Sequence, residues 1–288
     1  MANSDSAPLV PPPPDPSPGK EAATRRFPST RINHCAVPPW AIASPEFNSN
    51  PIPLELDGVR QSNRRIFDTL DRLEDPAERG RIFVEYLSVK FRLHEWDQHQ
   101  AEARRSLRNS WLRFLRGWGI DSNGIEGAVL KGWVESRFGI PPTYHKGKID
   151  GSFSETLGRY AIDRMKGHAC TNAIDAQLDL LFEFCQYELS RRNPARTHWT
   201  LYRGTCDSSE YKVIDKGPDR RATVQLNNLS SFTSDRERAW EFGSTVWKTE
   251  VPLSKIFFFG DVLPGSILRG ESEFLVIGRA YRLSEILW

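Results

Sequence analysis

The chain has 288 residues and a formal net charge of +2 at pH 7, from 39 basic and 37 acidic side chains. This near balance argues against the broad basic surface that nucleic-acid binding needs, and a hydrophobic fraction of 39% is that of an ordinary soluble protein. No apolar stretch approaches the roughly 20 residues that span a bilayer, and the N-terminus lacks the basic-then-apolar pattern of a secretory signal. We therefore expect a cytoplasmic protein with no nucleic-acid partner and no membrane insertion.

The first 53 residues divide into two parts. Residues 1–30 are rich in proline and include the run PPPPDPSP. Such a segment cannot form a core and favours extended polyproline conformations, so we expect a disordered tail. A PxxP ligand for a partner domain is the alternative. Residues 31–53 mix aromatic side chains with prolines, and we expect an ordered irregular segment that wraps over the body of the protein.

Residues 54–194 show the three- and four-residue apolar spacing of helices. One helix is predicted within residues 78–100. A second, through Trp111, ends near Gly117, and a third runs from Asn172 to Arg192, where an Asn-Pro pair stops it. Residues 117–127 and 138–152 are glycine- and proline-rich loops that could border a binding surface.

Residues 195–288 change to short strands rich in β-branched and aromatic residues. Strands are predicted at 197–204, 223–232, 244–253, 255–261, 272–278 and 280–287. A helix at 235–242 interrupts them, capped by Asp235 and packed through Ala239 and Phe242. The predicted fold class is α+β, a helical N-terminal region followed by a mixed, mostly antiparallel β core.

The cysteines and histidines are scattered, so no metal site is predicted. His94 and His99 are off the four-residue spacing that places two ligands on one helical face. The cysteines form no CxxC motif, which favours reduced thiols: Cys35, Cys170, Cys185 and Cys206.

Three groups in the β-rich part carry candidate chemistry. Glu271 and Glu273 would face the same way on a strand, about 7 Å apart. Arg203 closes another predicted strand, and its fork of donors suits phosphate oxygens. The hydroxyl cluster of LSSFTSD lies between them: Ser230, Ser231, Thr233 and Ser234. Each group has an alternative explanation, respectively a solvated strand face, a surface arginine and a helix N-cap. Together, arginine, serine and Glu-x-Glu suggest NAD-dependent ADP-ribosyl transfer.

A resemblance to a known family rests on NHCAVPPWAIASPEFNSNP, TLYRG, LSSFTSDRERAWEFGS and GESEFLVIG. The chain resembles the arginine-specific mono-ADP-ribosyltransferases of the Arg-Ser-Glu class, and more closely the dinitrogenase reductase ADP-ribosyltransferases of nitrogen-fixing bacteria. The resemblance covers the chain from about Asn33 to the C-terminus. It implies an ADP-ribosyltransferase core that uses NAD as co-substrate. The implied acceptor is an arginine of dinitrogenase reductase, the nitrogenase iron protein, whose modification reversibly inactivates nitrogen fixation. A PII signalling protein is the implied regulator.

The resemblance also implies roles for individual residues. Arg203 would grip the NAD phosphates beside Tyr202, and Gly204 would permit close approach of the ribose or nicotinamide. Glu273 would be the catalytic glutamate, and Glu271 would confer acceptance of arginine.

For the serine of the triad, the resemblance allows more than one register. Ser231 would position the catalytic glutamate and line the nicotinamide pocket. The sequence reads Ser-Phe-Thr-Ser where the family has Ser-Thr-Ser, so Thr233 or Ser234 could take that role.

The reaction explains why two carboxylates are needed. Cleavage of the nicotinamide–ribose bond develops positive charge that a fixed carboxylate, Glu273, would stabilise. A protonated guanidinium is a poor nucleophile, so Glu271 would orient it and help take its proton. Two alternatives remain: a transferase or NAD glycohydrolase that uses another acceptor, and a non-enzymatic adaptor.

Overall fold

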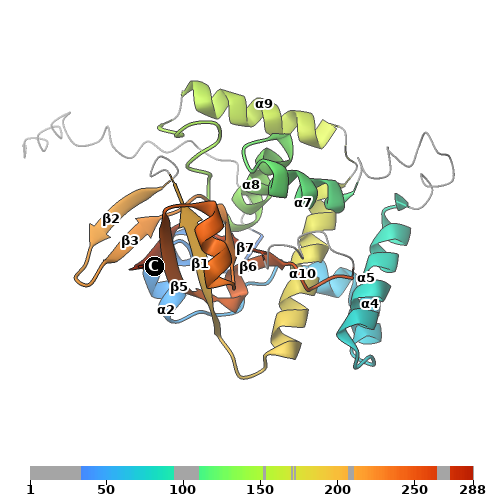
Figure 1. The fold of residues 1–288 in the computed structure, drawn as a ribbon. Helices are drawn as coiled ribbons and strands as arrows, with labels where there is room; N and C mark the ends of the chain where they lie inside the picture. Colours follow the sequence, from blue (N-terminus) through green and yellow to red (C-terminus); the bar gives the residue numbers. More distant parts are fainter. Residues whose placement is uncertain are drawn as a thin grey trace, which may run out of the picture.

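The structure, a computed structural model, describes residues 34–93, 110–151, 154–169, 171, 173–206, 211–264 and 273–287. The tail predicted at 1–30 lies outside these residues. Helices precede the strands along the chain (Figure 1), which confirms the predicted α+β class.

The strands form one antiparallel sheet in the order β2-β3-β8-β5-β1-β4-β7-β6. Their bounds are β1 His198–Thr205, β2 Lys212–Lys216, β3 Arg221–Gln225, β4 Leu229–Thr233, β5 Thr245–Pro252, β6 Ile256–Phe259, β7 Glu273–Ile277 and β8 Ala280–Ile286. The pairing of β1 with β5 runs the whole length of both strands, whereas β1 and β4 share the single register pair Tyr202 and Thr233. This short pairing borders the cavity described below.

Two strand predictions need correction. The strand predicted at 223–232 is two strands, because its halves pair with different neighbours: β3 with β8, and β4 with β1 and β7. Between them lies buried Asn228, whose side-chain amide donates to the carbonyl oxygens of Lys131 and Ile140. Strand β2 was not predicted. All five of its residues are exposed, so it lacks the buried alternation on which the sequence argument depends.

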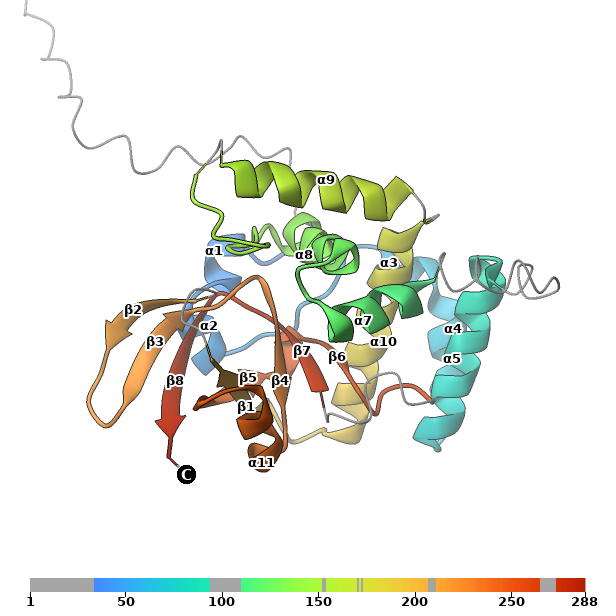
Figure 2. The same cartoon turned by 45° about the horizontal axis from the view of Figure 1, so that its top comes forward.

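The helices before the sheet are α3 Val59–Ser62, α4 Arg64–Leu70, α5 Pro76–Lys90, α7 Trp111–Ile120, α8 Ile125–Phe138, α9 Glu155–Ala169 and α10 Ile174–Arg192. Figure 2 shows α9 lying across α8, with α4 and α5 side by side. A short helix α11, Arg236–Ala239, and the 3-10 turns η4, Trp240–Phe242, and η5, Leu253–Lys255, lie among the strands.

Glycine caused the main errors in the helix predictions. Helix α7 continues past Gly117 to Ile120, and α8 begins inside the predicted loop 117–127. A Cβ on Gly117 would lie 2.4 Å from the Cγ of Glu126, so this glycine permits close packing of α7 on α8 and does not end a helix. Helix α10 ends at Arg192 as predicted; it begins at Ile174, and Asn172 lies outside the described residues.

The segment predicted to be irregular, 31–53, contains two short helices, α1 Pro39–Ile42 and α2 Pro45–Ser49. Ser44 caps α2, because its side chain accepts a hydrogen bond from the backbone N–H of Phe47. The segment packs on β8 through Asn48, whose side-chain nitrogen donates to the carbonyl oxygen of Ala280 at 2.8 Å.

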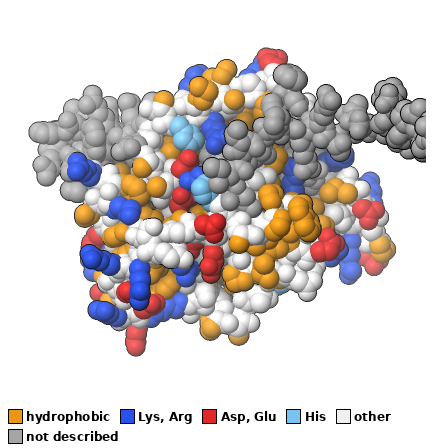
Figure 3. All heavy atoms as spheres, turned by 180° about the vertical axis from the view of Figure 1, so that it is seen from behind, with side chains coloured by type: hydrophobic (Ala, Val, Ile, Leu, Met, Phe, Trp, Pro, Cys, Tyr) orange, Lys and Arg blue, Asp and Glu red, His pale blue; other side chains and the backbone are white. Residues whose placement is uncertain are grey.

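On the face opposite to that of Figure 1, the described residues carry charges of both signs. Figure 3 shows Lys and Arg side chains interspersed there with Asp and Glu side chains. Among the described residues, no helix is long and apolar enough to cross a membrane.

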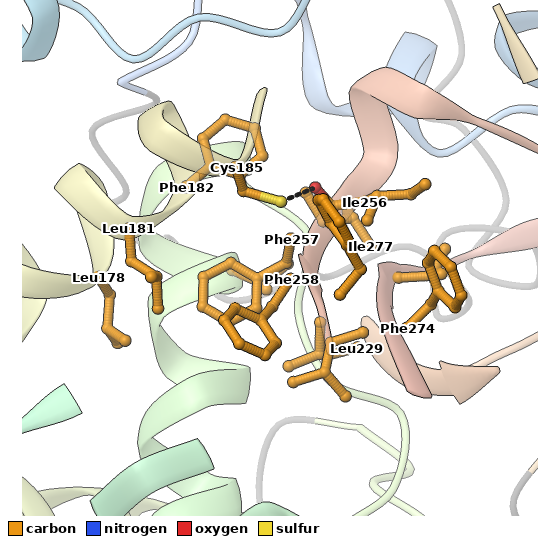
Figure 4. Close-up of a cluster of buried hydrophobic side chains, with 14 of the residues drawn as sticks. Leu178, Leu181, Phe182, Cys185, Leu229, Ile256, Phe257, Phe258, Phe274 and Ile277 are labelled. Atoms are coloured by element: carbon orange, nitrogen blue, oxygen red, sulfur yellow. Dashed lines mark hydrogen bonds between the residues drawn. The ribbon is translucent and has the colours of Figure 1, made fainter. Parts of the chain in front are cut away.

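The core joins the helices to the sheet through α10. Leu178, Leu181, Phe182 and Cys185 on one face of α10 meet side chains of β6 and β7 (Figure 4), and these helix side chains are fully buried. Burial of each large apolar side chain contributes about 1.5–3 kcal/mol. Gln186 donates to the carbonyl oxygens of Leu253 and Ile256, so α10 also covers backbone groups at the β6 edge. The helices and the sheet therefore share one hydrophobic core.

Candidate active site

A cavity of about 480 Å³ lies between β1, β4, the start of β7 and the segment that joins α7 to α8. Its volume is within the range of about 300–1,000 Å³ typical of small-molecule sites. The residues that line it include Trp118, Arg203, Ser231, Thr233, Phe242 and Glu273.

Glu273 is the first residue of β7 and lies opposite Thr233 of β4. It is 5% exposed, and its Oε1 accepts a hydrogen bond of 2.5 Å from the hydroxyl of Ser231. A buried carboxylate is stable only when hydrogen bonds replace its lost hydration, and a hydrogen bond to a charged oxygen is about twice as strong as a neutral one. The Ser231 hydroxyl supplies such a bond.

Ser231 connects three of the residues that line the cavity. Its carbonyl oxygen accepts a hydrogen bond of 2.7 Å from Nη1 of Arg203, and its hydroxyl accepts one of 2.8 Å from Nε1 of Trp118. With the contact to Glu273, Ser231 holds an arginine, an indole and a carboxylate around one residue of β4. The structure thus brings the arginine, serine and glutamate together.

The other hydroxyls of the cluster lie elsewhere. Thr233 is buried beside the cavity, and its Oγ1 accepts a hydrogen bond from the backbone N–H of Asp235. Ser234 is exposed and borders a different cavity, with Phe259 and Phe274. Because side chains alternate along a strand, Ser231 and Thr233 share one face of β4. The hydroxyl in contact with Glu273 is that of Ser231.

Tyr202 and Gly204 both line the cavity. The structure also shows a second reason why residue 204 is glycine. A Cβ on Gly204 would lie 1.9 Å from the carbonyl oxygen of Ala239, so only glycine lets α11 pack this closely on β1. Asp235 caps α11 as predicted, through the backbone N–H groups of Glu237 and Arg238. The prediction that Phe242 packs this helix against the rest of the protein was wrong, because Phe242 is 49% exposed and lines the cavity.

Sequence reasoning missed Trp118 as a site residue. Residues 118–123 line the cavity, and the glycine-rich loop predicted over 117–127 was the signal that this segment borders a binding surface. The buried Lys131 anchors the segment, because its Nζ donates to Oδ1 of Asn123 and to the carbonyl oxygen of Tyr144.

The second predicted loop, 138–152, is held by a buried histidine. Nε2 of His145 lies 3.0 Å from Oδ2 of Asp163, and Lys146 donates to the same carboxylate oxygen. Burial lowers the pKa of His145 and outweighs the opposite effect of Asp163, so the imidazole is neutral at pH 7. Tyr144 from this loop borders a small recess behind Arg203 and Ser231.

Some predicted features fall outside the described residues: Glu271, His94, His99 and Cys170. The prediction that Glu271 and Glu273 face the same way is therefore untested. Within the described part of the chain, no group of three or more His, Cys, Asp or Glu side chains is placed to hold a metal ion. The cysteines described there, Cys35, Cys185 and Cys206, form no disulfide.

Comparison with known proteins identifies the family to which this chain belongs. Residues 32–285 match the family described as dinitrogenase reductase ADP-ribosyltransferase (DRAT). The chain belongs to the DRAT family. A DRAT relative from Rhodospirillum rubrum, NAD(+)–dinitrogen-reductase ADP-D-ribosyltransferase, is 42% identical over 254 residues, which are 86% of this chain and 92% of the relative. No solved structure was found to match the chain. The DRAT match starts at residue 32, which confirms the family resemblance and leaves the proline-rich tail outside it.

Proposed function

We propose that this chain transfers ADP-ribose from NAD⁺ to an arginine of dinitrogenase reductase, with release of nicotinamide. The observation that carries the proposal is the hydrogen bond from Ser231 to the buried carboxylate of Glu273, beside Arg203 at the cavity wall. The name of the R. rubrum relative supports both the donor and the acceptor. The transfer would inactivate nitrogen fixation reversibly.

Arg203 is proposed to bind the diphosphate of NAD⁺. Its Nη1 donates to the Ser231 carbonyl oxygen, which fixes the guanidinium plane at the cavity wall. A guanidinium has five N–H donors in a rigid fork that matches pairs of phosphate oxygens. Tyr202 and Gly204, its neighbours on β1, are proposed to contact the same co-substrate.

Glu273 is proposed to hold the ribose 2′-hydroxyl and to stabilise the positive charge that develops as the nicotinamide–ribose bond breaks. A carboxylate that is already buried and hydrogen-bonded pays little reorganisation cost at that moment, which makes its charge effective. Ser231 holds the carboxylate in place, and Thr233 lines the same cavity.

Glu271 is proposed to orient the acceptor guanidinium and to help remove its proton. The proposal rests on its position two residues before Glu273 and on the need for a base near a protonated nucleophile. Recognition of a folded acceptor needs about 800 Å² of surface on each partner, more than the cavity mouth offers. The helical region and its loops are proposed to supply that surface.

Regulation by a PII signalling protein and a cytoplasmic location complete the proposal. The first is supported by the family resemblance, and the second by the cytoplasmic pool of NAD⁺ that the reaction would consume. Co-purification of the full chain with a PII protein tests the regulator, and cell fractionation tests the location.

The decisive experiment measures transfer of labelled ADP-ribose from NAD⁺ to purified dinitrogenase reductase by the native chain and by Glu273→Gln. We expect labelling by the native chain and its loss in the variant, because the amide keeps the shape but removes the charge. In Glu271→Gln, transfer should fall more than NAD⁺ hydrolysis does. Hydrolysis without labelling of dinitrogenase reductase would indicate another acceptor, and absence of both NAD⁺ binding and hydrolysis would contradict an enzymatic role.

A further inference from the structure

We infer that Trp118 is a positioning residue, whose indole N–H fixes the direction in which Ser231 donates its proton to Glu273. The inference rests on the role proposed above for Glu273. It links α7, in the helical region, to the proposed catalytic carboxylate through Ser231.

The three side chains form one continuous chain of hydrogen bonds. Nε1 of Trp118 lies 2.8 Å from Oγ of Ser231, and the same Oγ lies 2.5 Å from Oε1 of Glu273. Trp118 is only 4% exposed, so the indole is held by packing, and its hydrogen bond to Ser231 lies partly buried at the cavity wall.

With Glu273 ionised, as its proposed role requires, the three groups allow one arrangement of protons. An indole N–H can only donate, so the oxygen of Ser231 must accept from Trp118. A hydroxyl has a single proton, and an ionised carboxylate can only accept, so that proton goes to Glu273. Because each bond polarises the next, the bond from Trp118 strengthens the one that Glu273 receives. Without the indole N–H, the Ser231 hydroxyl could rotate to other acceptors.

Trp118 is itself held by the helical region. Helix α7 contacts both α8 and α10, and the backbone N–H of its first residue, Trp111, donates a hydrogen bond to Oε1 of Gln177. The ammonium of Lys131, on α8, lies 5.9 Å from the centroid of the Trp118 ring, within the range of a cation–π contact. The position of the carboxylate therefore depends on helices as well as on strands.

The test is the variant Trp118→Phe, which keeps an aromatic ring but removes the donor. We expect kcat for NAD⁺ hydrolysis to fall by about tenfold, as for a small misplacement of a catalytic group, with KM for NAD⁺ changed less than about twofold. The matched control is Trp133→Phe. Trp133 is also buried, and its Nε1 donates to Oδ1 of Asp179 at 2.7 Å, away from the cavity, so its loss should leave kcat unchanged.

A double-mutant cycle separates positioning from packing. If Trp118 acts through Ser231, Trp118→Phe should change kcat less than about twofold in a Ser231→Ala background. Full additivity of the two losses would overturn the inference, as would native kcat in Trp118→Phe. Trp118→His, which restores an N–H donor on a smaller ring, should keep more activity than Trp118→Phe, and equal losses would also overturn it. A native chain that binds but does not hydrolyse NAD⁺ would instead refute the proposed role of Glu273, and the inference with it.

Discussion

Gly204 shows how one residue can serve two requirements. The family resemblance implies that its missing side chain admits the ribose or nicotinamide, and the structure shows that the same absence admits the carbonyl oxygen of Ala239. The second requirement is backbone against backbone, which side-chain movement cannot relieve. A substitution here should therefore affect folding as well as NAD⁺ binding.

We predict that Gly204→Ala lowers the free energy of unfolding by about 1–3 kcal/mol, because α11 must move away from β1. Urea unfolding of the variant measures the loss. Gly158→Ala is the control: Gly158 lies in α9 with nothing within 4 Å of the added carbon, and alanine there should stabilise the chain by about 0.5–1 kcal/mol. Equal unfolding free energies for Gly204→Ala and the native chain would contradict the prediction.

At the scale of elements, α11 depends on its cap. It is a helix of four residues, too short to be stable by its own hydrogen bonds, and it follows β4 in the chain. Its first backbone N–H groups, those of Glu237 and Arg238, are satisfied by the carboxylate of Asp235. The cap thus holds the element that contacts Gly204 and continues to Phe242 at the cavity wall.

Asp235→Ala should cost about 1 kcal/mol of unfolding free energy and should raise KM for NAD⁺, since Phe242 loses its support. Denaturant unfolding and steady-state hydrolysis check the two effects. Asp235→Asn keeps an accepting oxygen and should stay within about 0.5 kcal/mol of the native chain. A loss in Asp235→Asn equal to that in Asp235→Ala would show that charge, and not capping, is the cause.

Across the whole molecule, Lys255 joins the N-terminal segment to the sheet. Its ammonium group is fully buried, donates to the carbonyl oxygen of Ile42 and to Oδ1 of Asn48, and lies 4.5 Å from the centroid of the Tyr281 ring. Burial lowers the pKa of Lys255 to about 7. Its usual pKa of 10.5 applies in the unfolded chain, so between these values the unfolded state holds one more proton than the folded state.

The expected result is that stability rises with pH between about 7 and 9, by roughly 1.4 kcal/mol per unit at most, and that below pH 7, where both states carry the proton, this group adds no pH dependence. Above pH 9 the effect is opposed by Cys185 and Tyr281, because burial raises the pKa of both. Unfolding of the native chain and of Lys255→Met at several pH values isolates the contribution. A Lys255→Met variant with the same pH dependence as the native chain would disprove it.

Much of the fold follows from local patterns, and the exceptions have specific causes. The switch from helical to strand spacing near residue 195 and the Asp235 cap are encoded in neighbouring residues. Helix α8 was missed because Gly117 and Gly127 read as loop residues, whereas each makes room for an atom of a neighbouring segment. Strand β2 was missed because it buries nothing.

For the site, the order of Arg203, Ser231 and Glu273 along the chain was sufficient to indicate the class of chemistry, because each residue type suits the role proposed for it. The sequence did not determine which hydroxyl contacts Glu273. The register of β4 on β7 decides that it is Ser231 and not Ser234. The contact of Trp118 with Ser231 is decided by the packing of α7. The two residues are 113 positions apart, and no local sequence pattern relates them. Hydrogen-bond geometry depends on distances of a few tenths of an ångström, and only the packed core determines distances between remote segments at that precision.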